Sequence, residues 1–248
     1  MQILGPVRIT TADGAIELRA ARERQLLALL AIQHDTVVTV ERLVDEIWDG
    51  APTDSAVAAL RVHVSRLRKT LSTAHLEHLL ETRPTGYLLR LGEEGSLDAD
   101  CFEAAASLGR SQLAEDDPAS AAVTLRRALS MWEGPVLLDV PSMLSVIAAR
   151  RRLDELRLVT TEDCLQAELD LGRHREVLAE LEALTHEHPL RERFCALRMR
   201  ALYRSGRQPE ALRAFQEHRS IVVDDVGLEP SPDLTALERR IVAQDPSI

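Results

Sequence analysis

The stretch 55–71, which reads SAVAALRVHVSRLRKTL, constrains the fold more than any other part of the chain. Apolar residues recur in it every three or four positions, the pattern of an α-helix with one buried face. It contains four cations and no acid. A slim cationic outer face suits the major groove of DNA, where Arg pairs with guanine and an apolar side chain meets a thymine methyl. A solvated basic helix fits the same pattern, so the flanking sequence has to decide. The expected stripe is Val57, Leu60, Val64, Leu67 and Leu71, and the cations are Arg61, Arg66, Arg68 and Lys69.

The residues directly before this helix predict a helix-turn-helix. Thr39 can cap a short helix over 40–48, and the Asp-Gly-Ala-Pro run at 49–52 forces a turn. Thr53 or Asp54 is expected to cap the long basic helix. A second helix placed after a turn in this way is free to enter a DNA groove.

A hairpin with an arginine at its tip is predicted after the basic helix. Strand-like runs at 79–82 and 87–91 flank the sequence Arg83-Pro84-Thr85-Gly86. Beside a recognition helix such a hairpin is a wing, which contacts the minor groove or a phosphate. The sequence therefore predicts a winged helix.

The first forty residues predict a small antiparallel sheet and a first helix. Asp13-Gly14 is a hairpin signal, and the leucine-rich stretch 21–33 has helical spacing. The expected short strands are 3–4, 7–10, 16–18 and 37–38.

From residue 98 the sequence is mainly helix-forming. Gly172 and Gly206 lie 34 residues apart in a repeated G-R-x-x-E-x-L pattern, the period of tetratricopeptide repeats. The predicted fold is mainly α, with an α+β winged-helix domain over 1–92 and a tetratricopeptide-like helical repeat domain over 98–248. The expected helices cover 100–114, 118–132, 146–171, 173–188, 190–204, 209–223 and 232–244.

The net charge of −10 lies entirely in the second part of the chain. Residues 1–92 hold 11 of the 30 basic and 11 of the 40 acidic side chains, so residues 93–248 hold 19 and 29. The neutral first part can bind a phosphate backbone through its acid-free helix, whereas the acidic second part is suited to protein partners.

The remaining composition indicates a cytoplasmic protein. No apolar run approaches the ~20 residues of a membrane span, and the N-terminus lacks the pattern of a signal peptide. Three cysteines far apart in the sequence are expected to be buried or half-buried single side chains rather than a disulfide framework. They are Cys101, Cys164 and Cys195.

Nothing in the sequence indicates catalysis, a cofactor or a metal. It contains no Gly-rich phosphate loop, Cys pair or catalytic triad. The pairs His75/His78 and His186/His188 lack a third and fourth ligand. We therefore expect a binding protein and not an enzyme.

The place of each residue on the surface of the basic helix, relative to the apolar stripe, predicts its role in DNA binding. Arg66 faces away from the apolar stripe and is the first candidate for base readout, with Val62 and Ser65 beside it. Cations on the flanks and at the wing tip are expected to contact phosphates, which position a protein without specifying sequence. They are Arg61, Arg68, Lys69 and Arg83.

Three segments resemble the winged helix of response-regulator-type transcription factors, and more narrowly that of Streptomyces antibiotic regulatory proteins. They are 41–48 (ERLVDEIW), 60–69 (LRVHVSRLRK) and 82–89 (TRPTGYLL). The second part resembles the bacterial transcriptional activation domain of the same family, through 138–141 (LDVP), 186–193 (HEHPLRER), 201–212 (ALYRSGRQPEAL) and 227–230 (GLEP).

The resemblance implies an activator that binds direct repeats near promoters as two or more head-to-tail protomers. It further implies recruitment of RNA polymerase holoenzyme at a secondary-metabolite gene cluster, and a DNA-backbone or supporting contact for His63. Because the winged helix starts at residue 1, we expect a small two-domain form without a phosphate-accepting receiver domain. A protein-interaction module that uses the winged helix for docking, and a DNA-binding repressor, remain alternatives.

Overall fold

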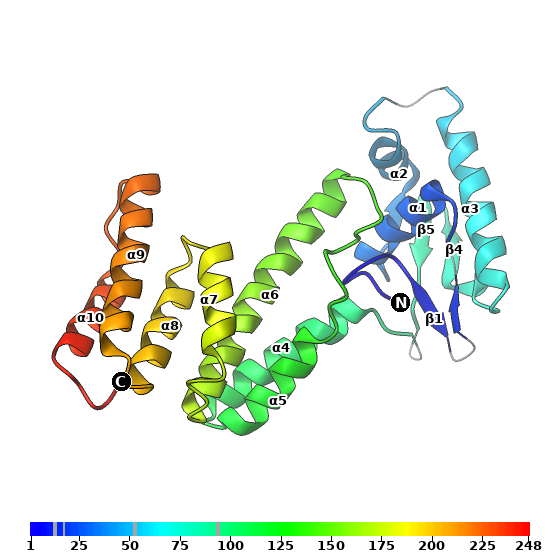
Figure 1. The fold of residues 1–248 in the computed structure, drawn as a ribbon. Helices are drawn as coiled ribbons and strands as arrows, with labels where there is room; N and C mark the ends of the chain where they lie inside the picture. Colours follow the sequence, from blue (N-terminus) through cyan, green and yellow to red (C-terminus); the bar gives the residue numbers. More distant parts are fainter. Residues whose placement is uncertain (12–13, 17, 52–53, 93–94) are drawn as a thin grey trace. The chain divides into compact units, whose positions relative to one another are not determined.

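A computed structural model describes residues 1–11, 14–16, 18–51, 54–92 and 95–248, and shows a mainly helical chain with small N-terminal sheets (Figure 1). In chain order the elements are β1 (Ile9–Thr11), β2 (Gly14–Ile16), α1 (Ala21–Ile32), β3 (Val38–Thr39), α2 (Val40–Ile47), α3 (Ala56–Ser72), the 3-10 turn η1 (Glu77–Leu79), β4 (Leu80–Arg83), β5 (Gly86–Leu89), α4 (Asp98–Ala114), α5 (Pro118–Leu129), α6 (Leu144–Asp170), α7 (Leu178–Glu187), α8 (Glu192–Arg204), α9 (Gln208–Val226) and α10 (Pro232–Val242).

The chain divides into two compact units. Unit 1 comprises Met1–Ala105 and Arg127–Leu158, and unit 2 comprises Ala106–Arg126 and Val159–Ile248. Helices α4, α5 and α6 each contribute residues to both units. The domain boundary predicted from the sequence between residues 92 and 98 stays a prediction. The compact unit that contains the winged helix also includes residues 97–105 and 127–158.

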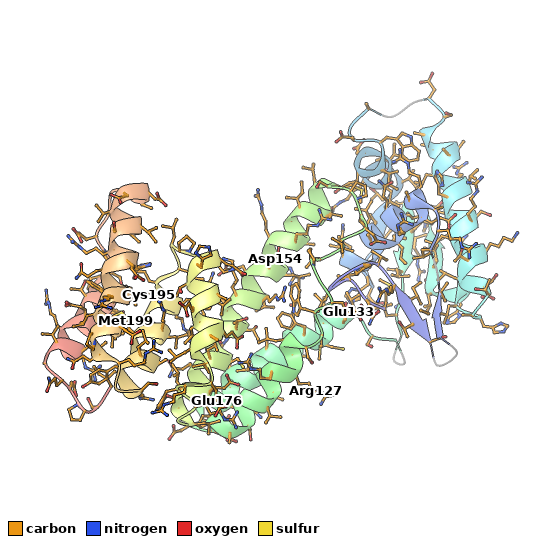
Figure 2. The ribbon with its side chains drawn as sticks, viewed as in Figure 1. Arg127, Glu133, Asp154, Glu176, Cys195 and Met199 are labelled. Atoms are coloured by element: carbon orange, nitrogen blue, oxygen red, sulfur yellow. The ribbon has the colours of Figure 1, made fainter. Side chains whose placement is uncertain are left out.

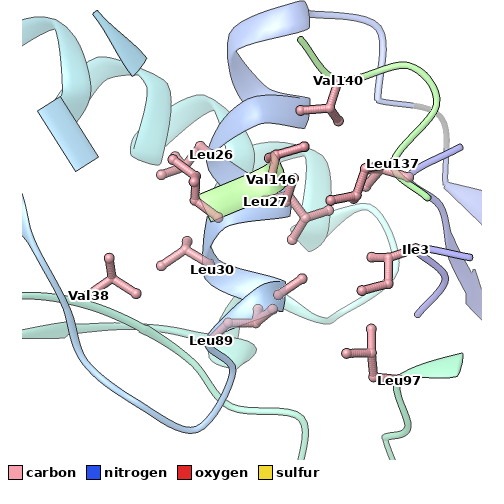
Figure 3. Close-up of a cluster of buried hydrophobic side chains, with 14 of the residues drawn as sticks. Ile3, Leu26, Leu27, Leu30, Val38, Leu89, Leu97, Leu137, Val140 and Val146 are labelled. Atoms are coloured by element: carbon pink, nitrogen blue, oxygen red, sulfur yellow. The ribbon is translucent and has the colours of Figure 1, made fainter. Parts of the chain in front are cut away.

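Unit 1 contains the predicted winged helix. Helix α3 packs on α1 and α2, and the sheet has the antiparallel order β3-β5-β4. Leu26, Leu27 and Leu30 of α1 are completely buried at the centre of the core (Figure 3). Thr39 caps α2 as predicted, because its hydroxyl accepts a hydrogen bond from the backbone N–H of Arg42.

The structure gives a steric reason for the glycine at position 86, in the segment 83–87 (RPTGY). Gly86 pairs with Thr39 across the β3–β5 ladder. A Cβ at this position would lie 1.9 Å from the carbonyl oxygen of Val38, which no side chain can occupy. A glycine here therefore lets β5 approach β3, and it places the wing hairpin directly beside the start of α2.

Helix α3 differs from the prediction at its N-terminal end. Leu60, Val64, Leu67 and Leu71 are buried as predicted, but Val57 is 42% exposed. Ala56, one residue earlier, is buried in its place, because the 100° rotation per residue moves the stripe off Val57 in the first turn. The N-cap position is Ser55 and not Asp54, and the alternative cap Thr53 lies outside the described residues. The wing strands β4 and β5 lie within a residue or two of their expected positions.

The N-terminal segment pairs with distant parts of the chain. The sequence predicts a strand at residues 3–4, but the structure has none there; only an isolated bridge pairs Gln2 with Arg8. Strands β1 and β2 pair as the expected hairpin, and residues 12–13 between them lie outside the described part of the chain. Backbone N–H groups of Glu133, Leu137 and Leu138 donate to the carbonyls of residues 4, 3 and 5 over 2.8, 2.9 and 3.1 Å. Loop 133–138 thus covers an edge that the first residues would otherwise expose.

Asp98 fastens the N-terminal segment to the start of α4. Its carboxylate accepts hydrogen bonds from the backbone N–H groups of Ile3 and Leu4 at 2.8–3.0 Å, and from that of Ala99 at 2.8 Å. Burial raises the pKa of this carboxyl above its ordinary value, and the N–H donors oppose that shift. Asp139 similarly accepts from the N–H of Val7 at 2.8 Å.

Residues beyond 96 complete the unit 1 core. Leu97, Leu137, Val140 and Val146 lie around the leucines of α1 in one buried cluster (Figure 3). Helix α2 also holds the start of α6, where the carboxylate of Glu46 accepts from the backbone N–H of Ser145 at 3.1 Å. The hydrophobic core of the winged helix therefore extends past residue 92.

Unit 2 consists of packed helices in the predicted repeat register. Gly172 and Gly206 follow α6 and α8 with φ of 79° and 77°, a left-handed conformation that favours glycine after a helix end. Helix α7 begins at Leu178 and not at Arg173, and residues 174–176 before it form a turn. The core joins α8, α9 and α10 through Cys195, Met199, Leu202, Ala211, Ala214, Phe215, Leu234, Leu237 and Ile241.

The cysteine prediction is correct for two of three residues. Cys164 and Cys195 are buried, whereas Cys101 is exposed on α4. The other predicted helices start and end within about three residues of their observed limits, as is usual for helix boundaries.

Substituting Asp98 should destabilise unit 1. Asp98→Ala removes the acceptor of three backbone N–H groups, so we expect a loss of about 1–3 kcal/mol in the free energy of unfolding. Urea unfolding of the full chain measures it, with Asp45→Ala on the exposed side of α2 as the matched control. Equal midpoints for the two variants would contradict the anchoring role of Asp98.

Candidate nucleic-acid interface

Helix α3 presents the predicted base-reading residues to solvent. Val62 is 49% exposed, and Ser65 and Arg66 are exposed beside it. Arg61 and Lys69 are exposed on the same helix, and within the described part of the chain no ion pair engages Arg61, Arg66 or Lys69. The structure thus brings five of the predicted site residues together on one cationic surface.

Arg68 has a different environment from the other cations of α3. Its guanidinium donates to the carbonyl of Leu80 from Nε at 3.1 Å and from Nη2 at 2.8 Å, and to Oγ1 of Thr82 at 2.7 Å. These bonds join the recognition helix to strand β4 of the wing. The phosphate contact assigned to Arg68 stays a prediction. In the structure the hydrogen bonds of this side chain position the wing against α3.

Arg83 at the wing tip is engaged with an acid of the same strand. It forms an ion pair with Glu81, which also pairs with Arg90 at 2.9 Å. The hydrogen bond from Arg90, followed by the charges of both arginines, lowers the pKa of Glu81, so its carboxylate stays charged at neutral pH. A DNA phosphate would have to compete with Glu81 for Arg83.

The wing tip is also fixed by the backbone. The N–H of Val40, at the start of α2, donates to the carbonyl of Thr85 at 3.1 Å. Together with the Arg68 bonds, this contact ties the hairpin to α2 and α3, so the wing and the recognition helix form one preorganised surface.

His63 supports the recognition helix from its inner flank. The imidazole is half-buried, and its ring centroid lies 6.3 Å from that of Trp48. The guanidinium of Arg22 lies 5.4 Å from the Trp48 ring and donates to the carbonyl of Ile47. Sequence reasoning did not find Arg22, because its partner lies 26 residues further along the chain.

The protonation state of His63 follows from this environment. Burial, then the positive charges of Arg66 and Arg22, lower its pKa from the ordinary value of 6.5, while Glu23 opposes them. The imidazole is therefore neutral at pH 7, so a phosphate contact by His63 would be a hydrogen bond rather than an ion pair.

An open groove runs beside α3, and sequence reasoning did not predict it. It has a volume of about 620 Å³ and lies between the β1–β2 hairpin, the start of α1 and the last turns of α3. Arg19, Arg66 and Lys69 line it, together with Glu23, a 7% exposed carboxylate at 3.5 Å from the hydroxyl of Thr70. Arg19 had no signal in the sequence because it lies in an irregular connection.

Two other features are absent from the described residues. No group of three or more His, Cys, Asp or Glu side chains there could hold a metal ion. No described helix is long and apolar enough to cross a membrane.

Comparison with known proteins assigns both parts of the chain. Residues 97–242 match the family "Bacterial transcriptional activator domain", and residues 14–89 match "Transcriptional regulatory protein, C terminal". The chain is 34% identical over its whole length to the regulatory protein DnrI of Streptomyces peucetius, 93% of which is covered. The chain belongs to the Streptomyces antibiotic regulatory protein family of transcriptional activators.

Other members of this family are longer than the chain. The regulatory protein AfsR of Streptomyces coelicolor is 39% identical over 99% of the chain, which spans about a quarter (24%) of AfsR. The solved structure of Mycobacterium tuberculosis EmbR in complex with a low-affinity phosphopeptide matches with a TM-score of 0.93 at 34% identity, covering 99% of this chain and 65% of that one. This similarity confirms the predicted fold class, a winged helix followed by a helical activator domain.

The lowered pKa of His63 predicts a pH-dependent stability. The unfolded chain binds a proton at His63 as the pH falls through about 6.5, whereas the folded chain resists it until the lower folded pKa. Stability that is present above pH 6.5 is therefore lost as the pH falls through that window. His63→Gln should lose less unfolding free energy than the parent chain between pH 7 and pH 5, as measured by urea unfolding. Parallel curves of unfolding free energy against pH for the two chains, or a His63 pKa at or above 6.5 in an NMR titration, would contradict the lowered pKa of His63.

Proposed function

We propose that this chain, a transcriptional regulator by family, is a sequence-specific DNA-binding activator in the cytoplasm that reads DNA through α3. The observation that carries the proposal is the acid-free exposed face of α3, where three cations lie without an intramolecular ion partner in the described part of the chain. Such a face supports both base readout and phosphate binding by one helix.

Base readout is assigned to Arg66, Val62 and Ser65. Arg66 carries the planar guanidinium that pairs bidentately with guanine, and it is exposed. Val62 offers an apolar contact for a thymine methyl, and Ser65 offers a hydroxyl to either kind of base. The three lie within two turns of one helix, which matches the reach of a recognition helix in a major groove.

Phosphate contacts are assigned to Arg61, Lys69 and Arg83. Arg61 and Lys69 are exposed on α3, and Arg83 reaches a phosphate by exchanging Glu81 for it. Arg68 contributes mainly by holding β4 to α3, and His63 by supporting the helix or by a neutral hydrogen bond to the backbone. Because phosphate contacts carry no sequence information, these residues set affinity and orientation.

The family supports the finer parts of the proposal. We infer binding to direct repeats near promoters by head-to-tail protomers, and recruitment of RNA polymerase holoenzyme at a secondary-metabolite gene cluster. The acidic second part of the chain would be repelled by DNA, which favours protein contacts for it.

Substitutions on α3 should separate specificity from affinity. Arg66→Ala removes a base contact, so it should cost about 1–3 kcal/mol on cognate DNA and relax discrimination at one base position. Lys69→Ala removes a phosphate contact, so it should weaken cognate and scrambled duplexes alike and flatten the salt dependence by about one unit of slope. Titrations of both duplexes at several salt concentrations measure these effects.

A substitution that is expected to strengthen DNA binding serves as the control for this experiment. Glu81→Gln removes the acid that competes for Arg83, so it should strengthen binding to both duplexes. Unchanged discrimination in Arg66→Ala would remove that residue from base readout. Salt-insensitive or absent binding of the parent chain would favour the alternative of a protein-interaction module.

A further inference from the structure

The open groove beside α3 lies on the flank of the helix that is opposite to the wing. Its wall from α3 consists of Arg66, Lys69, Thr70, Thr73 and Ala74. Arg68, which holds wing strand β4, follows Arg66 by two residues, so a turn of about 100° per residue places it about 200° further around the helix axis. The wing therefore lies on one side of α3, while the β1–β2 hairpin and the start of α1 lie on the other.

The exposed face of α3 that is proposed to read bases continues into this groove. Residues three or four apart on a helix lie next to each other on its surface. Four exposed residues follow one another at such spacings and form one row along the helix: Val62, Arg66, Lys69 and Thr73. A molecule that lies against the base-reading residues is therefore in line with the groove at the last turns of α3.

The groove carries a surplus of positive charge. Arg19, Arg66 and Lys69 line it and are exposed, so their charged ends are accessible to a ligand. The acid among its described lining residues is Glu23, which is 7% exposed and lies in the wall, with its Oε2 3.5 Å from the hydroxyl of Thr70. The volume of about 620 Å³ exceeds what a small anion fills, since one water molecule takes up about 30 Å³. These properties favour an extended polyanion.

The dimensions of B-DNA bring both flanks of an inserted helix close to phosphates. The major groove is about 12 Å wide, and an α-helix with its side chains is about 10–12 Å across. A helix that enters the groove therefore fills it and has one sugar-phosphate strand on each side. With α3 in the major groove, the wing lies beside one strand and the cationic groove lies beside the other.

We propose that the groove between α3 and the β1–β2 hairpin holds this second phosphate strand, and that Arg19 contacts it from outside the helix-turn-helix. Lys69 contacts the same strand from α3, while Arg66 extends past it to the bases. This inference rests on the DNA binding proposed for α3, and it adds the segment directly before α1 to the interface. Phosphate contacts on both flanks fix the orientation of α3 in the major groove.

Removing the charge of Arg19 tests the contact. Arg19→Gln should weaken binding to cognate and scrambled duplexes several-fold at low salt, because a phosphate contact carries no sequence information. The slope of log affinity against log salt should become shallower by about 0.9, the value of one phosphate contact. Arg127, labelled on α5 in Figure 2, is exposed and does not line the groove, so Arg127→Gln is the matched control and should leave the slope unchanged.

Adding a cation to the groove separates the effect of charge from an effect on folding. Thr73 is exposed in the groove, and its hydroxyl donates to the carbonyl of Thr70 in the same helix at 2.7 Å. Thr73→Lys should strengthen binding to both duplexes several-fold, a gain that misfolding cannot produce. Ser130, exposed directly after α5, makes the matching bond to the carbonyl of Arg127 at 2.8 Å, so Ser130→Lys adds the same charge outside the groove and should give no such gain.

The parent chain distinguishes a failure of this inference from a failure of the function on which it rests. If the parent chain shows no salt-dependent DNA binding, the proposed function is wrong and the phosphate contact is wrong with it. If the parent chain binds DNA but Arg19→Gln or Thr73→Lys behaves like its control, the inference alone is overturned. The groove would then belong to another partner, such as an acidic protein segment.

Discussion

The structure of the part proposed to read DNA depends on the burial of one face of α3. Leu60, Val64, Leu67 and Leu71 are each 0–2% exposed and pack toward α1 and α2. Burying a side chain of this size contributes roughly 1.5–3 kcal/mol, so this stripe outweighs any exposed ion pair of the helix. The same burial fixes the rotation of α3 and thereby leaves its cations in solvent. The recognition proposed for α3 is then a consequence of core packing, because the core decides which face of the helix remains available.

The core that holds α3 is built from distant parts of the chain. The leucines of α1 lie under α3 on one side and contact residues from 97 onward on the other. Asp98 and the backbone of loop 133–138 satisfy donors and acceptors of the first five residues. The start of the activator domain is therefore part of the folding unit of the winged helix. Destabilising that region should impair DNA binding without any change on the DNA-facing surface.

The sequence alone predicted the local features of the fold and site, and it missed the nonlocal ones. Helical periodicity located α3 and four of its five stripe residues, and the strand-like runs on either side of residues 83–86 located the wing. It failed at Val57, where one residue decides which side chain of the first turn is buried. The ion pair of Arg83 with Glu81 joins residues two apart on one strand, which share a face, and the sequence reasoning overlooked it. That reasoning could not show that Arg68 has intramolecular partners, since its hydrogen bonds to Leu80 depend on the final placement of β4. The pairing of residues 3–5 with loop 133–138 has no signal in either segment for the same reason.

The most direct test of the central claim is to measure which residues of α3 touch DNA bases. A photoreactive amino acid at position 65, on the exposed face between Val62 and Arg66, should crosslink to a base within the protected promoter site. The same group at position 45, on the exposed side of α2, serves as the control. Base adducts are expected from position 65, and they should be lost when scrambled DNA replaces the promoter at physiological salt. Base adducts from position 45 alone, or none from position 65 under conditions in which the promoter is bound, would contradict that claim.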